Sequence, residues 1–226
     1  ADWKTDPAIL LHLCRLGIPT GLQMSMITLG GMVLQSVLNG FGVVFVAGYT
    51  AANKLYGILE SASVAFGYAM TAYMGQNRGA RNAARIDAGI RAVLVLSAEF
   101  TAAIVTAMLV AGKPLLGLFL STEEAGAADA LAVAYQYLMV LMAFLFALFM
   151  LQAYRSSLQG LGEMTVPTLS GFAEMLMRMG AALVLPTFIG QSGVFFAEGA
   201  AWVCAAALNL VWYYMRIGKI KREMMQ

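Results

Sequence analysis

The sequence predicts an all-α integral membrane protein with six transmembrane helices, and two observations lead to this fold class. Of its 226 residues, 61% are hydrophobic and only 12% are charged, whereas soluble domains are about 45–50% apolar and about 25% charged. The apolar residues also gather into six stretches, each at least as long as the ~20 residues that a helix needs to cross a bilayer. A water-soluble fold would leave large apolar faces exposed.

The six predicted spans cover residues 16–41, 47–74, 87–111, 128–154, 164–189 and 194–216. A short amphipathic segment at 6–15 leads into the first span, and a basic tail at 217–226 follows the last. The breaks between spans contain turn residues: Gly40 and Gly42, Gly75 and Gly79, Lys113-Pro114 and Ser121-Thr122-Glu123-Glu124, Gly160 and Gly162, and Gly190 to Gly193. Such short links make consecutive helices antiparallel neighbours, so the chain is expected to form one six-helix lobe.

The prolines are placed as the predicted spans require. Pro19 and Pro167 fall near the starts of the first and fifth spans, where a missing backbone N–H breaks no helical hydrogen bond. Pro186 falls near the outer end of the fifth span, where we expect it to bend or end the helix.

The basic residues predict the orientation of the lobe. One side of the predicted bundle carries Lys4, Arg15, Arg78, Arg81, Arg85, Arg91, Arg155, Arg216, Lys219, Lys221 and Arg222. The other side carries only Lys113, together with Glu123, Glu124 and Asp129. Because short cytoplasmic loops are enriched in Lys and Arg, we expect a multi-pass protein of the inner (plasma) membrane with both ends of this chain in the cytoplasm.

The second span carries polar residues at mid-depth. At 100° per residue, Asn53, Tyr56 and Glu60 share one stripe of the helix, and Lys54 lies about 120° around from Glu60. Lipid makes such groups costly, so they usually face a partner helix or a wet cavity. We therefore predict that Glu60 binds a proton, Na⁺ or a cationic substrate; the alternative is a structural carboxylate bonded to a neighbouring helix.

Further acids and bases occur in the third, fifth and sixth spans. Glu174 and Arg178 are spaced i,i+4, with the acid first, an order that favours an ion pair. Glu99 has no evident partner on its own span, and could pair with Arg178 or Lys54 across the bundle. Glu198, near the outer end of the sixth span, is expected to reach the membrane interface.

The first span carries Gln35 and Asn39 one turn apart. These neutral hydrogen-bonding groups are suited either to lining a cavity or to joining two helices. Together with the residues of the second, third and fifth spans, they complete the set of candidate substrate- or ion-binding positions.

Several other functions find little support in the composition. The two cysteines and the single histidine have no metal-ligand spacing and no disulfide framework, so we expect neither a metal site nor an organic cofactor. An intramembrane enzyme would need a nucleophile with a base, or a metal cluster. The net charge of +2 gives no electrostatic support for a nucleic-acid partner, which leaves the bilayer and small molecules as expected partners.

Three segments resemble one known transporter family. They are Gly75-Gln76-Asn77-Arg78-Gly79-Ala80 after the second span, Gln159 to Pro167 between the fourth and fifth, and Ile18-Pro19 at the start of the first. With six spans, they resemble the C-terminal half of a multidrug and toxic compound extrusion (MATE) transporter. The resemblance implies a twelve-helix antiporter whose two lobes enclose a cavity, and which exports cationic or amphipathic drugs in exchange for H⁺ or Na⁺. The first residue is Ala1, so the chain is expected to be the C-terminal lobe of a longer transporter.

One departure from the family pattern affects the coupling ion. Some members carry coupling carboxylates in helices that match the first and fourth spans, but residues 17–42 and 130–154 contain no acid and are apolar near Ile27 and Leu148. The coupling acid is then either in an N-terminal lobe or at Glu60 or another buried acid of this chain. Two alternatives stay open: a flippase of the same superfamily that moves lipid-linked oligosaccharides, and a half-size transporter that functions as a homodimer.

Overall fold

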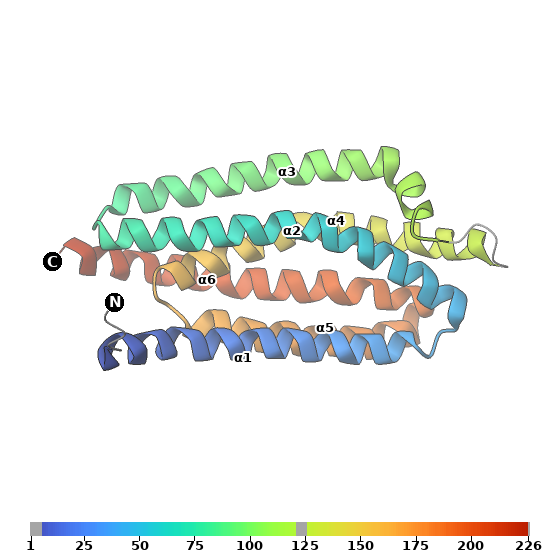
Figure 1. Cartoon of the computed structure of the whole chain (residues 1–226), viewed down its shortest axis with the longest axis horizontal. Helices are drawn as coiled ribbons and strands as arrows, with labels where there is room; N and C mark the ends of the chain where they lie inside the picture. Colours follow the sequence, from blue (N-terminus) through green and yellow to red (C-terminus); the bar gives the residue numbers. More distant parts are fainter. Residues whose placement is uncertain (1–5, 121–125, 226) are drawn as a thin grey trace, which may run out of the picture.

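The computed structural model describes residues 6–120 and 126–225, and every regular element in these ranges is helical. The helices are α1 (Pro7–Leu38), α2 (Val43–Gly79), α3 (Ala83–Gly117), α4 (Ala127–Gly160), α5 (Thr165–Ile189), the 3₁₀ helix η1 (Gln191–Phe195) and α6 (Phe196–Met225). The long helices run antiparallel along the long axis of the molecule (Figure 1). The predicted all-α class is confirmed.

Several helices extend beyond the predicted spans. The predicted lead-in belongs to α1, because the Asp6 carboxylate accepts a hydrogen bond from the Ala8 amide at 2.8 Å and Pro7 occupies the first turn. The expectation that Lys113-Pro114 ends the third helix is wrong, since α3 continues to Gly117. A proline so close to the end of a helix disturbs only its last turn. The predicted tail is helical up to Met225, and residues 121–125 lie outside the described ranges.

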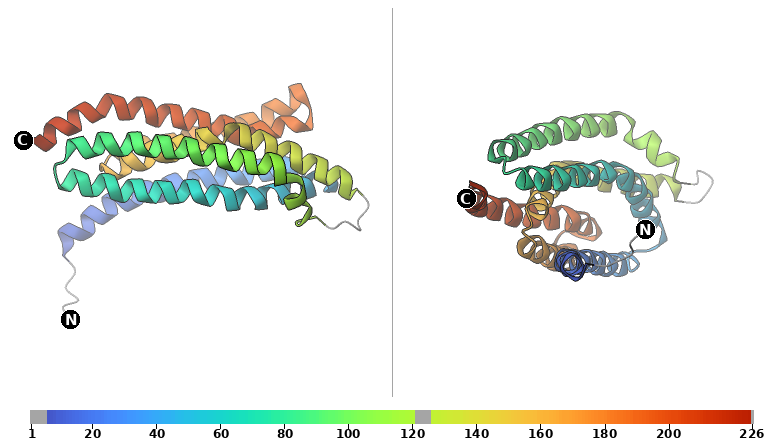
Figure 2. Two further views of the ribbon diagram at one scale, coloured as in Figure 1. Left: turned by 90° about the horizontal axis from the view of Figure 1, so that it is seen from above. Right: turned by 60° about the vertical axis from the view of Figure 1, so that its left-hand side comes forward.

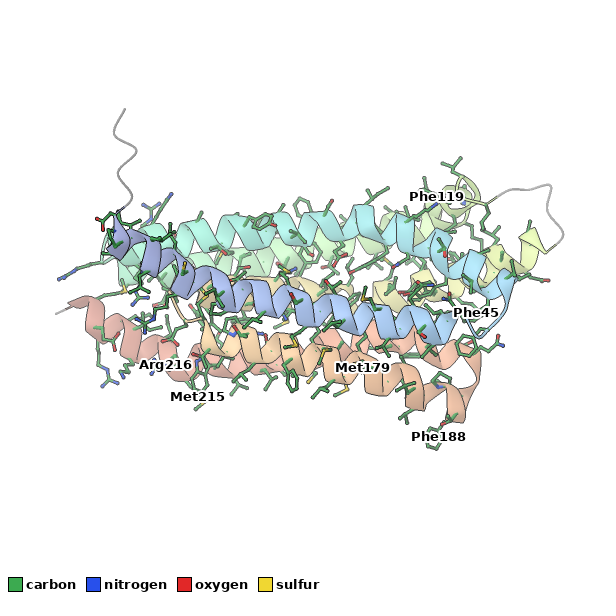
Figure 3. The ribbon with its side chains drawn as sticks, turned by 60° about the horizontal axis from the view of Figure 1, so that its bottom comes forward. Phe45, Phe119, Met179, Phe188, Met215 and Arg216 are labelled. Carbon is green, nitrogen blue, oxygen red and sulfur yellow. The ribbon has the colours of Figure 1, made fainter. Side chains whose placement is uncertain are left out.

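The described helices suit a multi-pass membrane protein. Five of them, namely α1, α3, α4, α5 and the combined η1–α6 segment, are long and apolar enough to cross a bilayer. The remaining helix, α2, is the longest of the described helices at 37 residues. Its polar residues keep it outside this apolar group. It lies beside the other helices along the bundle (Figure 1). Large side chains such as Phe188 (79% exposed) and Met215 (67% exposed) project outward (Figure 3), as a lipid-facing surface requires.

The start of α1 and the end of α6 lie at the same end of the bundle (Figure 1). We call this end, and the half of the bundle next to it, the inner half. The links from α2 to α3 and from α4 to α5 also lie there, whereas the links from α1 to α2 and from α5 to α6 lie in the outer half (Figure 1). Helix ends are tied together in the inner half by Arg216 bonded to Glu163 at 2.7 Å and by Lys221 paired with Asp87.

Helix packing leaves α1 apart from α2. The centre of the lobe is α4, which packs on α2, α3 and α6, while α1 packs on α5 and makes no extended contact with α2. From the link at residues 39–42, α1 and α2 diverge toward the inner end (Figure 2). Close packing of α2 on α4 requires Gly160, because a Cβ there would lie 2.4 Å from the carbonyl oxygen of Thr71. The separation of α1 and α2 positions the candidate site.

Buried aromatic rings fill the outer half of the bundle. Phe195 of η1 stacks on Phe45 of α2 and on Tyr137 of α4, with ring centroids 5.3 and 5.1 Å apart. Tyr137 in turn stacks on Tyr49 at 4.5 Å, and its hydroxyl donates to the Tyr49 hydroxyl at 3.3 Å. We call these four residues the aromatic cluster. All four are at most 7% exposed, so they close the outer half of the lobe.

Candidate functional site: a charged cavity in the inner half

A cavity of about 610 Å³ lies between α1 and α2, in the inner half of the bundle. Its walls are residues from α1, α2, α4 and α5, and Trp202 of α6 contributes at mid-depth. Its size falls within the range of roughly 300–1,000 Å³ that is usual for small-molecule sites. All of its lining residues come from the helices of this chain.

Two polar stripes form the wall opposite α1 and α2. On α4, Gln152, Arg155, Ser156 and Gln159 line the cavity, and their spacing of i, i+3, i+4 and i+7 places them on one helix face. On α5, both Glu174 and Arg178 line it, four residues apart. Both stripes are therefore set by helix periodicity, and the packing of both α4 and α5 on α6 brings them together.

Four charged side chains form a continuous chain of ion pairs, which we call the buried ion network. Arg155 contacts Glu174 at 2.6 Å, Glu174 contacts Arg178 at 3.0 Å, and Arg178 contacts Glu198 of α6 at 2.8 Å. The first three side chains are only 4–6% exposed, and Glu198 is 16% exposed. Burial of single charges in a membrane bundle would be very unfavourable, and two cations with two anions give a network of zero formal charge.

Hydrogen bonds attach α1 to this wall. The Gln159 side-chain amide donates to the Gln23 side-chain carbonyl at 3.0 Å, and the Arg178 guanidinium donates to the backbone carbonyl of Ile27 at 3.1 Å. Gln23 also packs tightly on Gly171 of α5. A Cβ added at Gly171 would lie 2.6 Å from the Cγ of Gln23. These contacts hold α1 against α4 and α5 while leaving it apart from α2.

Glu60 lines the same cavity from α2 and is half-buried. Within residues 6–120 and 126–225 it forms no ion pair. One turn away, Tyr56 is 5% exposed and stacks on Trp202 with ring centroids 5.5 Å apart. Because the buried ion network is neutral by itself, Glu60 gives the cavity a formal charge of −1 when ionised.

The structure brings some of the predicted site residues together and leaves others apart. Glu60, Glu174 and Arg178 line one cavity, Tyr56 is buried beside it, and the predicted i,i+4 ion pair of Glu174 with Arg178 is confirmed. The other candidates are exposed residues that do not line this cavity, namely Asn53, Lys54, Gln35, Asn39 and Glu99. Gln35 and Asn39 bond to each other at 3.1 Å. Whether any of these residues binds a ligand stays a prediction.

Two expectations about charged residues are wrong. Glu198 does not reach the interface, because Arg178 holds it inside the bundle. Arg155, counted with the basic residues that flank the spans, is buried and pairs with Glu174. The pairing considered for Glu99 is also absent from the described ion pairs, since Glu99 is exposed on α3 and Arg178 is occupied by two other acids.

The polar face of α4 has a signal in the sequence. The i, i+3, i+4, i+7 spacing of Gln152, Arg155, Ser156 and Gln159 indicates a single helix face. The predicted fourth span, 128–154, ends within this face. Only the observed length of α4, which continues to Gly160, places this face inside the bundle.

Comparisons with known proteins agree with this architecture. The MatE family model matches residues 19–184, which is most of the chain. The chain belongs to the MatE family. Among curated proteins, the MatE chain is 30% identical to a "Probable multidrug resistance protein YpnP" of Bacillus subtilis (strain 168), over 97% of this chain and 47% of the relative. The chain therefore spans about half the length of the curated relatives that it matches.

Solved structures show the same fold at low identity. One neighbour is a MOP superfamily transporter from Pyrococcus furiosus, described as having a binding pocket of reverse polarity (TM-score 0.87, 22% identity). A second is a MATE protein in complex with MaL6 (TM-score 0.86, 21% identity). Each match covers 97% of this chain and 49% of the neighbour. The fold of this MatE chain is thus that of half of a MATE transporter.

The positions at which some MATE transporters were expected to carry coupling acids are apolar in this MatE chain. Ile27 and Leu148 both line the cavity. The cavity therefore has an apolar surface at these two positions, and its unpaired carboxylate is on α2 instead.

Proposed function

We propose that this MatE chain is one lobe of a cation-coupled antiporter that exports cationic or amphipathic small molecules. Glu60 is the residue proposed to bind the coupling ion, H⁺ or Na⁺, or the cationic cargo. The observation that carries the proposal is the charge balance of the cavity, in which Glu60 stands beside a buried ion network that is already neutral.

A lone carboxylate in such a cavity has a clear physical role. In a low-dielectric site an uncompensated negative charge is unfavourable, so occupation by a proton, Na⁺ or a cationic cargo lowers the free energy of the lobe. The two kinds of cation then compete for one carboxylate. This competition is what exchange of cargo for ion requires, provided that the access of the site alternates.

The same charge balance favours an antiporter over a flippase for lipid-linked oligosaccharides. A pyrophosphate group would need cations without partners in the cavity. The two arginines that line the cavity, Arg155 and Arg178, are both paired with acids. Membership of the MatE family also favours transport over an intramembrane enzyme.

The architecture proposed for the whole transporter has two lobes with the cargo path between them. Its support is that the chain covers about half of its relatives and of its structural neighbours. The inner half is proposed to face the cytoplasm, because Arg78, Arg81, Arg85 and Lys219 gather at that end. If the chain were instead a half-size homodimer, the mass of the purified complex in detergent would be twice that of one chain.

The test is the substitution Glu60→Gln in the complete gene product, reconstituted in vesicles. Ethidium efflux is measured under an imposed pH gradient and, separately, under an imposed Na⁺ gradient. We expect the variant to lose the response of efflux to whichever gradient drives the unmodified protein, because the amide cannot exchange a cation.

The control is Glu223→Gln, which removes an acid from an exposed position on α6. We expect efflux and its ion dependence to stay within about twofold of the unmodified protein. Ion-coupled efflux that survives in Glu60→Gln as fully as in Glu223→Gln would refute the role of Glu60.

A further inference from the structure

An apolar groove of about 580 Å³ lies between α2 and α3, separate from the charged cavity. The two helices run side by side at one edge of the bundle (Figure 1). The residues that line the groove are apolar or aromatic, and none of them is charged. A charged cargo would find no counter-ion on these walls, so the groove suits a hydrocarbon chain.

Aromatic contacts join α2 to α3 at the two ends of the groove. At the inner end, the Tyr73 hydroxyl donates to the backbone carbonyl of Arg85 at 2.9 Å. At the outer end, the ring of Phe66 packs edge-on against Phe100 with centroids 5.1 Å apart. Between these contacts the side chains are short, which leaves the groove open; the exposed alanines are Ala65 and Ala69 of α2 and Ala88 and Ala92 of α3.

An exposed arginine stands at the inner end of the groove. Arg85 is three residues before Ala88 and seven before Ala92, a spacing that places all three on one face of α3. Arg85 forms no ion pair among the described residues. The nearby acid Asp87 is already paired with Lys221, so the positive charge of Arg85 is available to a ligand.

The depth of the groove matches one leaflet of a bilayer. Arg85 and Leu96, the outermost residue of α3 in the groove, are separated by ~16 Å along the helix axis. Half of the hydrocarbon core is ~15 Å thick. Glu99 lies ~21 Å from Arg85 by the same measure, so it is too distant to oppose an anion at Arg85.

We propose that this groove binds an anionic phospholipid of the inner leaflet, with one acyl chain between α2 and α3 and the phosphate at Arg85. Anionic headgroups attract arginines at the membrane surface, and a long arginine side chain reaches the headgroup level from a buried backbone position. A single lipid molecule supplies both the apolar chain and the negative charge. The site is independent of the proposed function, since neither Glu60 nor the charged cavity takes part in it.

The experiment measures which lipid occupies the groove. Phe100→Trp places a fluorescent reporter at an exposed ring (47%) in contact with Phe66. The complete gene product is reconstituted in nanodiscs of phosphatidylcholine with brominated acyl chains, which quench a tryptophan that they contact. Unbrominated phosphatidylglycerol is then added in increasing proportion, and quenching by the protein without the reporter is subtracted. The loss of quenching gives the affinity of phosphatidylglycerol relative to phosphatidylcholine.

We expect phosphatidylglycerol to bind about fivefold more tightly at this reporter, the effect of one cation next to an anionic headgroup. A second reporter, Phe188→Trp, occupies an outward-facing position of α5 (Figure 3). It should give a relative affinity near one, as expected for ordinary lipid contacts.

Matched variants of α3 locate the preference. With the Phe100→Trp reporter, Arg85→Gln should lower the relative affinity toward one, whereas Arg85→Lys should keep it. The control is Arg91→Gln, which removes an exposed arginine from a different face of α3.

A second pair of variants tests the groove itself. Ala92→Phe places a ring in the groove, and should also remove the preference because the acyl chain is excluded. Ala98→Phe, at an exposed position on another face of α3, should keep it.

Three results would overturn the proposal. A relative affinity near one at the Phe100→Trp reporter means that the groove holds ordinary lipid. A preference that survives Arg85→Gln as fully as Arg91→Gln means that Arg85 does not bind the headgroup. A reporter that is not quenched at all means that protein covers the groove. None of these results bears on ion-driven efflux, so this proposal and the role of Glu60 fail separately.

Discussion

The two halves of this bundle are filled in opposite ways. In the outer half, the aromatic cluster packs rings from α2, α4 and η1 with little exposure to solvent. In the inner half, the helices surround a cavity with a charged wall. The same helices α2 and α4 contribute to both halves, so the difference arises from the residues on their faces and from the position of α1.

The comparison shows what each half contributes. Stacked rings attract one another in any apolar environment, so the outer half needs no ligand to be complete. Among the described residues of the inner half, the Glu60 carboxylate lines the cavity without an ion-pair partner. We therefore interpret the outer half as a closed end and the inner half as the binding half.

The largest effect is expected at the centre of the buried ion network. Glu174→Gln leaves both Arg155 and Arg178 without their shared acid, and removing one partner of a buried ion pair typically destabilises a protein by about 3–5 kcal/mol. Thermal unfolding of the purified protein in detergent measures the change. The control is Glu223→Gln, whose pair with Lys219 is long (3.9 Å) and exposed. Equal stability of the two variants would mean that the inner half does not depend on charge pairing.

The next largest effect is expected in the aromatic cluster. Phe195→Ala removes a ring that is 1% exposed and stacks on two others, for which the usual loss of stability is about 3–5 kcal/mol in a close-packed core. If the two halves are independent, ion-driven ethidium efflux at a temperature where the variant is folded should stay within about twofold, because effects at distant sites are usually independent.

The control for this substitution is Phe188→Ala, at an outward-facing ring that is 79% exposed (Figure 3). It should unfold at nearly the same temperature as the unmodified protein. A large loss of ethidium efflux in Phe195→Ala at a temperature where the variant is folded would show that the two halves are not independent.

The smallest loss of stability is expected from a substitution that removes a hydrogen bond of the aromatic cluster but keeps its ring stacking. Tyr137→Phe keeps the stacked ring but removes the donor to the Tyr49 hydroxyl. We expect a loss of about 0.5–1.5 kcal/mol, the usual net value of one hydrogen bond, measured by the same unfolding assay. Tyr68→Phe, at an exposed position of α2, is the control. A loss as large as that of Phe195→Ala would mean that the hydroxyl, and not stacking, holds the outer half together.

Much of the fold could be predicted because its signals are local. The length of the apolar stretches and the order of the turn residues predict helices without knowledge of tertiary contacts. The i,i+4 spacing also predicted the ion pair of Glu174 with Arg178, which is confirmed. Helix ends were less predictable. The apolar signal stops where a helix leaves the lipid, but α4 and α6 continue beyond that point to Gly160 and Met225.

The site could be predicted only in part, because its partners are distant in the sequence. Glu174 lies 19 residues from Arg155 in the chain, and Arg178 on α5 pairs with Glu198 on α6. Glu60 and Glu99 look alike in the sequence as single acids within apolar spans. The structure separates them, since one lines the cavity and the other is exposed on α3.

The sequence by itself determined that this protein is a bundle of membrane helices and in which order the helices follow. Both depend only on composition and on the length of apolar stretches. Only the tertiary structure decided which charges neutralise one another and where a cavity remains. The reason is that pairing energies and voids depend on the distances between helices. Here α1 packs on α5 and stands apart from α2, which leaves Glu60 facing a cavity instead of a partner.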